Sequence, residues 1–161
     1  MSNVLRFARK HGPSLPSGSP PLIRSAQAIW RGDGSTGCGA ICVESAEPAE
    51  RPYSLMGRLA SGNGTNPAEL LAAAHASCFT TYLAFSLQSM GYPPAELSTE
   101  AVVTLEPDGA SMRMSRSALT LRARVPNIDR GTFEAIAWHA EQTCPISKAL
   151  RAQITLNAKL I

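Results

Sequence analysis

The stretch at residues 70–90, LLAAAHASCFTTYLAFSLQSM, decides the fold of this chain. It contains no Asp, Glu, Lys or Arg, and Pro67 stands just before it, where proline suits the first turn of a helix. The sequence Gly-Tyr-Pro-Pro at 91–94 follows with residues that end helices. A helix that is apolar or small on every side is normally buried. We therefore expect 70–90 to form the central helix of a protein core, with the thiol of Cys78 in dry surroundings.

Bulk composition narrows the class of protein. A length of 161 residues fits one domain with a substantial core. The net charge of +3 is mild, and no run of Lys and Arg is interleaved with aromatic residues, so nucleic acid is not an expected partner. The length of 70–90 would suit a bilayer, but its Ala, Ser, Thr, His and Gln make it less hydrophobic than a typical spanning helix. We expect no membrane association.

The N-terminal region differs from the rest of the chain. The first 32 residues contain Arg and Lys but no acid, and several prolines lie there among serines and glycines. We interpret 1–22 as a flexible arm and 23–161 as the folded domain, although such a start is also compatible with an organelle transit peptide. No apolar signal region is present, and the four cysteines do not form a disulfide scaffold. These features favour a cytoplasmic protein.

Short strands surround the central helix in the sequence. A second helix is expected after Asp129, a suitable N-cap, because Phe133, Ile136, Ala137 and Ala140 follow the helical period and Cys144 continues the same stripe. Pro145 then breaks that helix or starts a short one.

Alternation along 112–125 places Leu119 and Leu121 on one strand face and Thr120 and Arg122 on the other. Strands are expected at 25–30, 39–44, 53–59, 97–105, 112–125 and 154–160. Clusters of strands around two helices indicate an α+β fold.

Two cysteines stand out by their context. Cys78 lies in the charge-free helix, and Cys144 ends the apolar stripe of the second helix. If the two helices pack side by side, the sulfurs could approach to the roughly 2 Å of a disulfide. The alternative is that both are ordinary buried cysteines. Cys38 and Cys42, four apart in an expected strand, would lie about 13 Å from each other and are interpreted as incidental.

The residues around these cysteines match a known family. Gly-Thr-Asn-Pro at 64–67, followed by ELLAAAHASCF at 69–79, resembles the signature of the OsmC/Ohr family of osmotically inducible and organic hydroperoxide resistance proteins. CPISKAL at 144–150 resembles the second cysteine motif of that family, and VPNID at 125–129 resembles its approach to the second helix. The likeness covers roughly 25–161, and the form AHASCF is more similar to the OsmC branch than to the Ohr branch.

The resemblance implies a fold and a chemistry. The fold would be OsmC-like, with antiparallel strands around two central helices. An intertwined homodimer is also expected, because a helix buried on every side in so small a chain suggests help from a second subunit. The family members are thiol-dependent peroxidases without a cofactor or metal. Cys78 would attack an organic hydroperoxide and become a sulfenic acid, and Cys144 would condense with it to a disulfide. An external dithiol, in the family typically a lipoyl group on a protein, would restore both thiols.

The resemblance also suggests residues that support the thiol. Arg58 matches the active-site arginine of the family, whose charge would offset the effect of burial on the thiolate. The glutamate that commonly pairs with it is replaced by Ala68, and Glu69 follows one position later. On an ideal helix Glu69 points away from Cys78, so it either substitutes through a bend at the helix entry or only favours the helix dipole. This departure places the partner of the arginine in question.

Other side chains near Cys78 have competing interpretations. Tyr82 and Phe85, one and two turns after Cys78, are candidates for an apolar substrate pocket or for plain core. His75 is expected to be a hydrogen-bonded core histidine, with tuning of the Cys78 thiol as the alternative. His139 is expected to be a solvated side chain on the second helix. We therefore expect an organic hydroperoxide reductase. The alternatives are a non-catalytic protein that binds an apolar ligand, for which Ala68 is the hint, or a cysteine hydrolase with His75 or His139 as base. The cysteines lack the spacing of a zinc site.

Overall fold

A computed structural model describes residues 23–33, 37–44, 51–53 and 64–161. The expected arm at 1–22, Arg58 and most of the expected strand at 53–59 lie outside the described residues. The chain divides into two compact units, one within Pro16–Leu71 and one comprising Ala72–Ile161. Each unit is described by itself, and the predicted bounds of the arm at 1–22 and the domain at 23–161 stay predictions.

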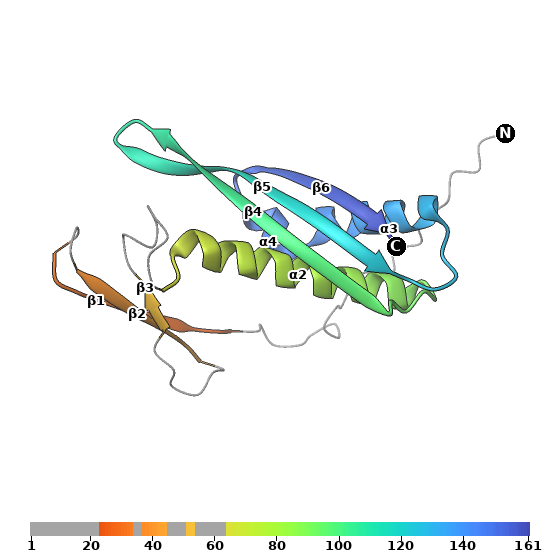
Figure 1. The fold of residues 1–161 in the computed structure, drawn as a ribbon, viewed down its shortest axis with the longest axis horizontal. Coiled ribbons are helices and arrows are strands. Elements are labelled where there is room, and N and C mark those ends of the chain that lie inside the picture. The colour runs from red at the N-terminus through yellow and green to blue at the C-terminus, as the bar shows by residue number, and fades with distance from the viewer. Residues whose placement is uncertain (1–22, 34–36, 45–50, 54–63) are drawn as a thin grey trace. The chain divides into compact units, whose positions relative to one another are not determined.

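The smaller unit is built on a three-stranded antiparallel sheet. Its strands are β1 (Ala26–Arg31), β2 (Cys38–Val43) and β3 (Arg51–Tyr53), in the order β1-β2-β3 (Figure 1). The first two strands lie within one residue of the predicted ranges. The rings of Trp30 and Tyr53, from β1 and β3, have centroids 5.6 Å apart, so an aromatic contact spans the sheet.

The larger unit combines three helices with a second three-stranded sheet. Its elements are α2 (Pro67–Ser89), β4 (Glu96–Asp108), β5 (Ser111–Arg124), α3 (Arg130–Thr143), α4 (Pro145–Ala149) and β6 (Gln153–Leu160). The predicted hairpin is confirmed, because β4 pairs antiparallel with β5. The expectation of antiparallel strands throughout is wrong for one pair, because β6 lies parallel to β5. The chain between them crosses over through α3 and α4, and such a crossover returns a strand in the parallel direction.

The helices of this unit cover one face of its sheet (Figure 1). Along β5 the predicted alternation is confirmed, with Leu119 and Leu121 buried and Thr120 and Arg122 exposed. The core joins the buried face of this strand to α2 and α3, and Ile146 of α4 packs against it. Its fully or almost fully buried members are Phe79, Leu83, Leu87, Leu119, Leu121, Ala123, Val125, Phe133, Ile136, Ala137, Ala140 and Cys144. Cys144 thus belongs to the core itself, while Cys78 is partly buried against it.

Helix α2 has the predicted ends but not the predicted burial. After the helix, Gly91 adopts a φ of 89°, and the Tyr92 N–H bonds to the Leu87 carbonyl at 2.9 Å, which closes the C-terminus as glycine-ended helices do. The expectation that α2 is buried on every side is wrong, because only His75, Phe79, Leu83, Ser86 and Leu87 are buried. These five follow the helical period, so a single sheet covers a single face of the helix.

The opposite face of α2 is small or apolar and exposed. Leu70 and Phe85 are 37% and 47% exposed, respectively. By length and a mean hydropathy of 1.4, α2 also meets a simple criterion for a membrane span. Its buried face nevertheless packs in one core with β5 and α3, as the core helix of a folded domain does.

Candidate active site

The motif at 64–67 builds the start of α2. Gly64 has a φ of 102°, and a Cβ there would lie 2.6 Å from the Pro52 carbonyl oxygen, so only glycine fits. The Asn66 Oδ1 accepts hydrogen bonds from the N–H groups of Ala68 and Glu69, both at 3.0 Å, and Pro67 occupies the first helical position. The residues at 64–67, which belong to the motif that resembles the family signature, therefore serve to begin α2.

Glu69 takes part in the same helix start. The Thr65 hydroxyl donates to the Glu69 carboxylate at 3.1 Å, and Glu69 is exposed. An acidic side chain in the first turn is also favoured by the helix dipole. The structure thus gives Glu69 a local role, while its pairing with Arg58 stays a prediction because Arg58 lies outside the described residues.

The second cysteine lies at a junction between two helices. Asp129 caps α3 as predicted, since its carboxylate accepts from the Thr132 N–H at 3.0 Å and from the Thr132 hydroxyl at 2.6 Å. Cys144 ends α3, with its N–H bonded to the Ala140 carbonyl at 2.9 Å, and also precedes α4, which Pro145 begins. The backbone of Cys144 is not helical, with a φ of −57° and a ψ of 126°, so this residue separates the two helices.

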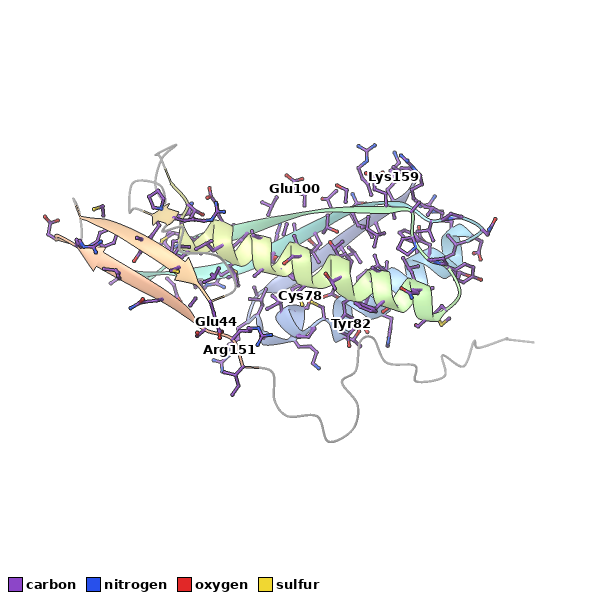
Figure 2. All side chains as sticks on the ribbon, turned by 90° about the horizontal axis from the view of Figure 1, so that it is seen from below. Glu44, Cys78, Tyr82, Glu100, Arg151 and Lys159 are labelled. Atoms are coloured by element: carbon purple, nitrogen blue, oxygen red, sulfur yellow. The ribbon has the colours of Figure 1, made fainter. Side chains whose placement is uncertain are left out.

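The two helices bring the predicted thiols together. The Cys144 Sγ lies 3.5 Å from the Cys78 Sγ, although the two residues are 66 positions apart in the sequence. Both are free thiols; Cys144 is fully buried and Cys78 is partly buried. Figure 2 shows Cys78 midway along α2, with Tyr82 one turn further along the same helix. A disulfide needs an S–S distance of about 2 Å, so only a short approach separates the thiols from a bond.

The surroundings of Cys78 hold it as a thiol. Burial raises the pKa of Cys78, and the hydrogen bond and charge interaction with Cys144 raise that pKa further. The Ile146 N–H acts in the opposite direction, because its hydrogen bond to the sulfur stabilises the thiolate and lowers the pKa. The net shift is upward. A cation beside the sulfur would oppose this upward shift of the pKa, and this is the role predicted for Arg58.

A network of buried, hydrogen-bonded polar side chains is centred on His75, one turn before Cys78 on α2. The Nδ1 of His75 is 2.8 Å from the Ser117 hydroxyl, and its Nε2 is 2.9 Å from the Ser147 hydroxyl. Ser147 is also hydrogen-bonded to the carboxylate of Glu141. The interpretation of His75 as a satisfied core histidine is confirmed, since it is fully buried and both ring nitrogens have partners. Burial lowers the pKa of His75, so the imidazole is neutral.

Three members of this hydrogen-bond network, Ser117, Ser147 and Glu141, were not predicted from the sequence. Ser117 shares the buried face of β5 with Leu119, and Glu141 directly follows the buried Ala140 on α3. A polar residue in phase with an apolar stripe is the signal that points to such positions. Ser147 and Ile146 carry no comparable signal, because the five residues of α4 are too few to show a period.

The remaining candidates are less closely tied to the thiols. Tyr82 is partly buried and Phe85 is exposed, so plain core is the wrong interpretation for Phe85, and their role in a substrate pocket stays a prediction. His139 is exposed on α3, as expected. Cys38 and Cys42 are both free in β2. Within the described part of the chain, no three potential metal ligands gather.

Comparison with known proteins decides the family. A family model described as "OsmC-like protein" matches residues 60–159. This chain belongs to the OsmC-like family. Peroxiredoxin OsmC of Escherichia coli is 38% identical over 139 residues, which cover 86% of this chain and 97% of the relative. An organic hydroperoxide resistance protein of Xanthomonas axonopodis pv. citri is 33% identical over 104 residues, covering 63% and 70%, respectively.

Solved structures agree on the OsmC/Ohr fold. The organic hydroperoxide resistance protein OhrB of Bacillus subtilis superposes with a TM-score of 0.61 at 24% identity, covering 85% of this chain and 98% of its own. An OsmC-like protein of unknown function from Vibrio cholerae gives a TM-score of 0.72 at 13% identity, covering 86% and 100%. The resemblance to the OsmC/Ohr family and the expected fold class are thereby confirmed, and the names of its relatives indicate a peroxidase-type enzyme.

Proposed function

We propose that this protein is a cysteine-based peroxidase that reduces organic hydroperoxides to alcohols. The observation that carries the proposal is the pair of free thiols 3.5 Å apart, with Cys78 on α2 and Cys144 at the junction of α3 and α4. Two sulfurs that close, with one fully buried and one partly accessible, form a disulfide with little rearrangement. The printed names of its relatives, peroxiredoxin and organic hydroperoxide resistance protein, point to the same chemistry.

The reaction is written in three balanced steps. The Cys78 thiolate attacks one peroxide oxygen, the O–O bond breaks, and the alkoxide leaves and takes up a proton to give the alcohol. Cys78 is then a sulfenic acid. The sulfur of Cys144 attacks that of Cys78, an S–S bond forms, and the hydroxyl leaves as water with the proton of Cys144. An external dithiol reduces the disulfide by exchange through a mixed disulfide.

We propose roles for three further groups. The Ile146 N–H stabilises the Cys78 thiolate through its hydrogen bond to the sulfur. Arg58 supplies the positive charge that offsets burial, with Glu69 or another carboxylate as its partner. Tyr82 and Phe85, on the turns of α2 that follow Cys78, contact the organic part of the peroxide, which favours organic hydroperoxides over hydrogen peroxide.

Assembly and location complete the proposal. We propose a homodimer, because α2 leaves an apolar face with Leu70 and Phe85 exposed and a second subunit would bury it. The reductant is proposed to be a dithiol such as a protein-bound lipoyl group, and the protein is proposed to be cytoplasmic, where thiols stay reduced. Light scattering on the purified protein measures the oligomeric state directly, and a mass of one chain would contradict the dimer.

Peroxide consumption tests the function. Purified protein is supplied with a dithiol and either cumene hydroperoxide or hydrogen peroxide. We expect dithiol-dependent turnover that is faster with the organic peroxide and is abolished in Cys78→Ser. Cys144→Ser should consume one equivalent and then stall. Full turnover by Cys78→Ser would overturn the mechanism, and absence of turnover by folded, reduced protein would favour a protein that only binds an apolar ligand.

A further inference from the structure

The hydrogen-bond network centred on His75 joins three parts of the larger unit. His75 lies on α2, Ser117 on β5 and Ser147 on α4, and all three are at most 7% exposed. The two hydroxyl groups lie 2.8 and 2.9 Å from the two ring nitrogens of His75. The imidazole therefore connects the sheet on one side with the short helix α4 on the other.

Both ring nitrogens of His75 are occupied by these hydroxyl groups, whichever nitrogen carries the proton. Burial raises the pKa of Glu141, and a hydrogen bond with Ser147 opposes that rise. Burial lowers the pKa of His75, so the imidazole carries no charge.

This hydrogen-bond network uses the same two segments as the contact between the thiols. His75 precedes Cys78 by three positions on α2, and Ser147 follows Cys144 by three positions. The segment 144–147 is thus linked to α2 at two places: at the Cys78 sulfur, through the Cys144 sulfur and the Ile146 N–H, and at His75, through Ser147. Helix α4 has only five residues, and the Cys144 side chain makes no hydrogen bond that caps it. So short a helix is held in place by its tertiary contacts and not by its own stability.

The two links respond differently to the proposed reaction. Oxidation of Cys78 to a sulfenic acid places an oxygen on its sulfur and removes the direct contact between the thiols. The hydrogen bond between His75 and Ser147 involves no sulfur, so the same oxidation leaves it intact. It is the link that still holds Cys144 against α2 while the disulfide has yet to form.

We propose that His75 and Ser147 are positioning residues, whose hydrogen bond holds the segment 144–147 against α2 so that Cys144 stays within reach of Cys78. The proposal rests on the proposed function for its biological meaning, but the positioning itself concerns only disulfide formation. It assigns a purpose to a buried histidine whose two ring nitrogens both bond to serine hydroxyl groups.

Two matched variants separate positioning from general stability. Ser147→Ala and Ser117→Ala each remove one buried hydroxyl from the same imidazole, but only Ser147 lies on the segment that carries Cys144. The equilibrium between dithiol and disulfide is measured in mixtures of reduced and oxidised glutathione, with Cys38 and Cys42 replaced by Ser. The balance is one protein disulfide and two reduced glutathiones formed from one protein dithiol and one oxidised glutathione.

We expect Ser147→Ala to lower the equilibrium constant for the disulfide about tenfold, which corresponds to about 30 mV. Ser117→Ala should stay within about threefold of the parent, and Ser147→Thr, which keeps the hydroxyl, should lie closer to the parent than Ser147→Ala. Equal effects of the two alanine variants, or no effect of Ser147→Ala, would overturn the proposal. The measurement needs no peroxide, so an absence of peroxidase turnover would contradict the proposed function without touching this inference.

A measurement on the unmodified chain covers the case in which Ser147→Ala does not fold. The N–H groups of Lys148 and Leu150 donate to the carbonyls of Cys144 and Ile146 at 3.0 and 3.1 Å, respectively. Their hydrogen exchange reports the opening of α4. We expect similar protection in the dithiol and disulfide forms, because the link through His75 exists in both. Loss of protection by more than about tenfold in the dithiol form would show that the sulfurs alone hold α4, and would overturn the proposal.

Discussion

Oxidation of the thiol pair should stabilise the protein by an amount that the chain topology sets. Cys78 and Cys144 are 66 positions apart, so a bond between them closes a long loop in the unfolded chain. The chain-entropy relation gives about 4.4 kcal/mol of stabilisation at 25 °C for a loop of this length. The sulfurs must approach by about 1.5 Å from their present distance to reach disulfide length, and strain from that approach subtracts from the gain.

We expect the oxidised protein to exceed the reduced one by about 3–4 kcal/mol in the free energy of unfolding. For a chain of this size that corresponds to a Tm higher by roughly 10 °C. The assay is thermal unfolding of both forms in a background where Cys38 and Cys42 are replaced by Ser, with mass spectrometry to establish the intramolecular bond. Cys144→Ser is the matched control, and its Tm should not respond to the oxidant in the same way.

An equal or lower Tm in the bonded form would refute this reasoning. It would mean that the sulfurs close only by displacing α4 from the core, and that the arrangement at 3.5 Å is not close to the bonded one. A bond found between subunits instead of within one chain would refute it as well.

Three further predictions concern the core and the thiol. Phe79→Ala, at a fully buried position, should lower the free energy of unfolding in urea by about 3–5 kcal/mol, and a comparable loss in Phe85→Ala, at an exposed position, would contradict the assigned core. Because burial lowers the pKa of His75 in the folded state, its contribution to stability is full above the unfolded pKa of about 6.5 and is lost as the pH falls through the folded value. Between pH 7.5 and 5, the free energy of unfolding in urea should thus decline more steeply in the parent than in His75→Gln. An identical pH dependence in the two proteins would contradict a lowered pKa of His75. Arg58→Met should move the pH profile for alkylation of Cys78 to higher pH, and an unmoved profile would remove Arg58 from the site.

Local signals in the sequence predicted much of the fold. Pro67 and the sequence at 91–94 define the ends of α2, and Asp129 caps α3, because each acts within a few residues of itself. The alternation along β5 fixed its buried face for the same reason. The pairing of Cys78 with Cys144 came from resemblance to a family, since spacing alone left two interpretations open.

The features that the sequence did not predict depend on distant partners. The parallel pairing of β6 with β5 results from the path of the chain through α3 and α4, which no residue of β6 encodes. The burial of α2 on one face depends on which elements cover it, and charge-free composition is compatible with either outcome. The partners of His75 lie 42 and 72 positions away, so only the folded chain shows that they meet.

The central claim is that a hydroperoxide oxidises Cys78 and Cys144 to one disulfide. The most direct test treats fully reduced protein with one equivalent of cumene hydroperoxide and maps the cysteine-containing peptides by mass spectrometry without reduction. We expect a single linked pair, Cys78 with Cys144, with Cys38 and Cys42 still thiols and one equivalent of alcohol released. Unreacted thiols at 78 and 144 after the peroxide has been consumed, or a bond formed from Cys38 or Cys42, would contradict it.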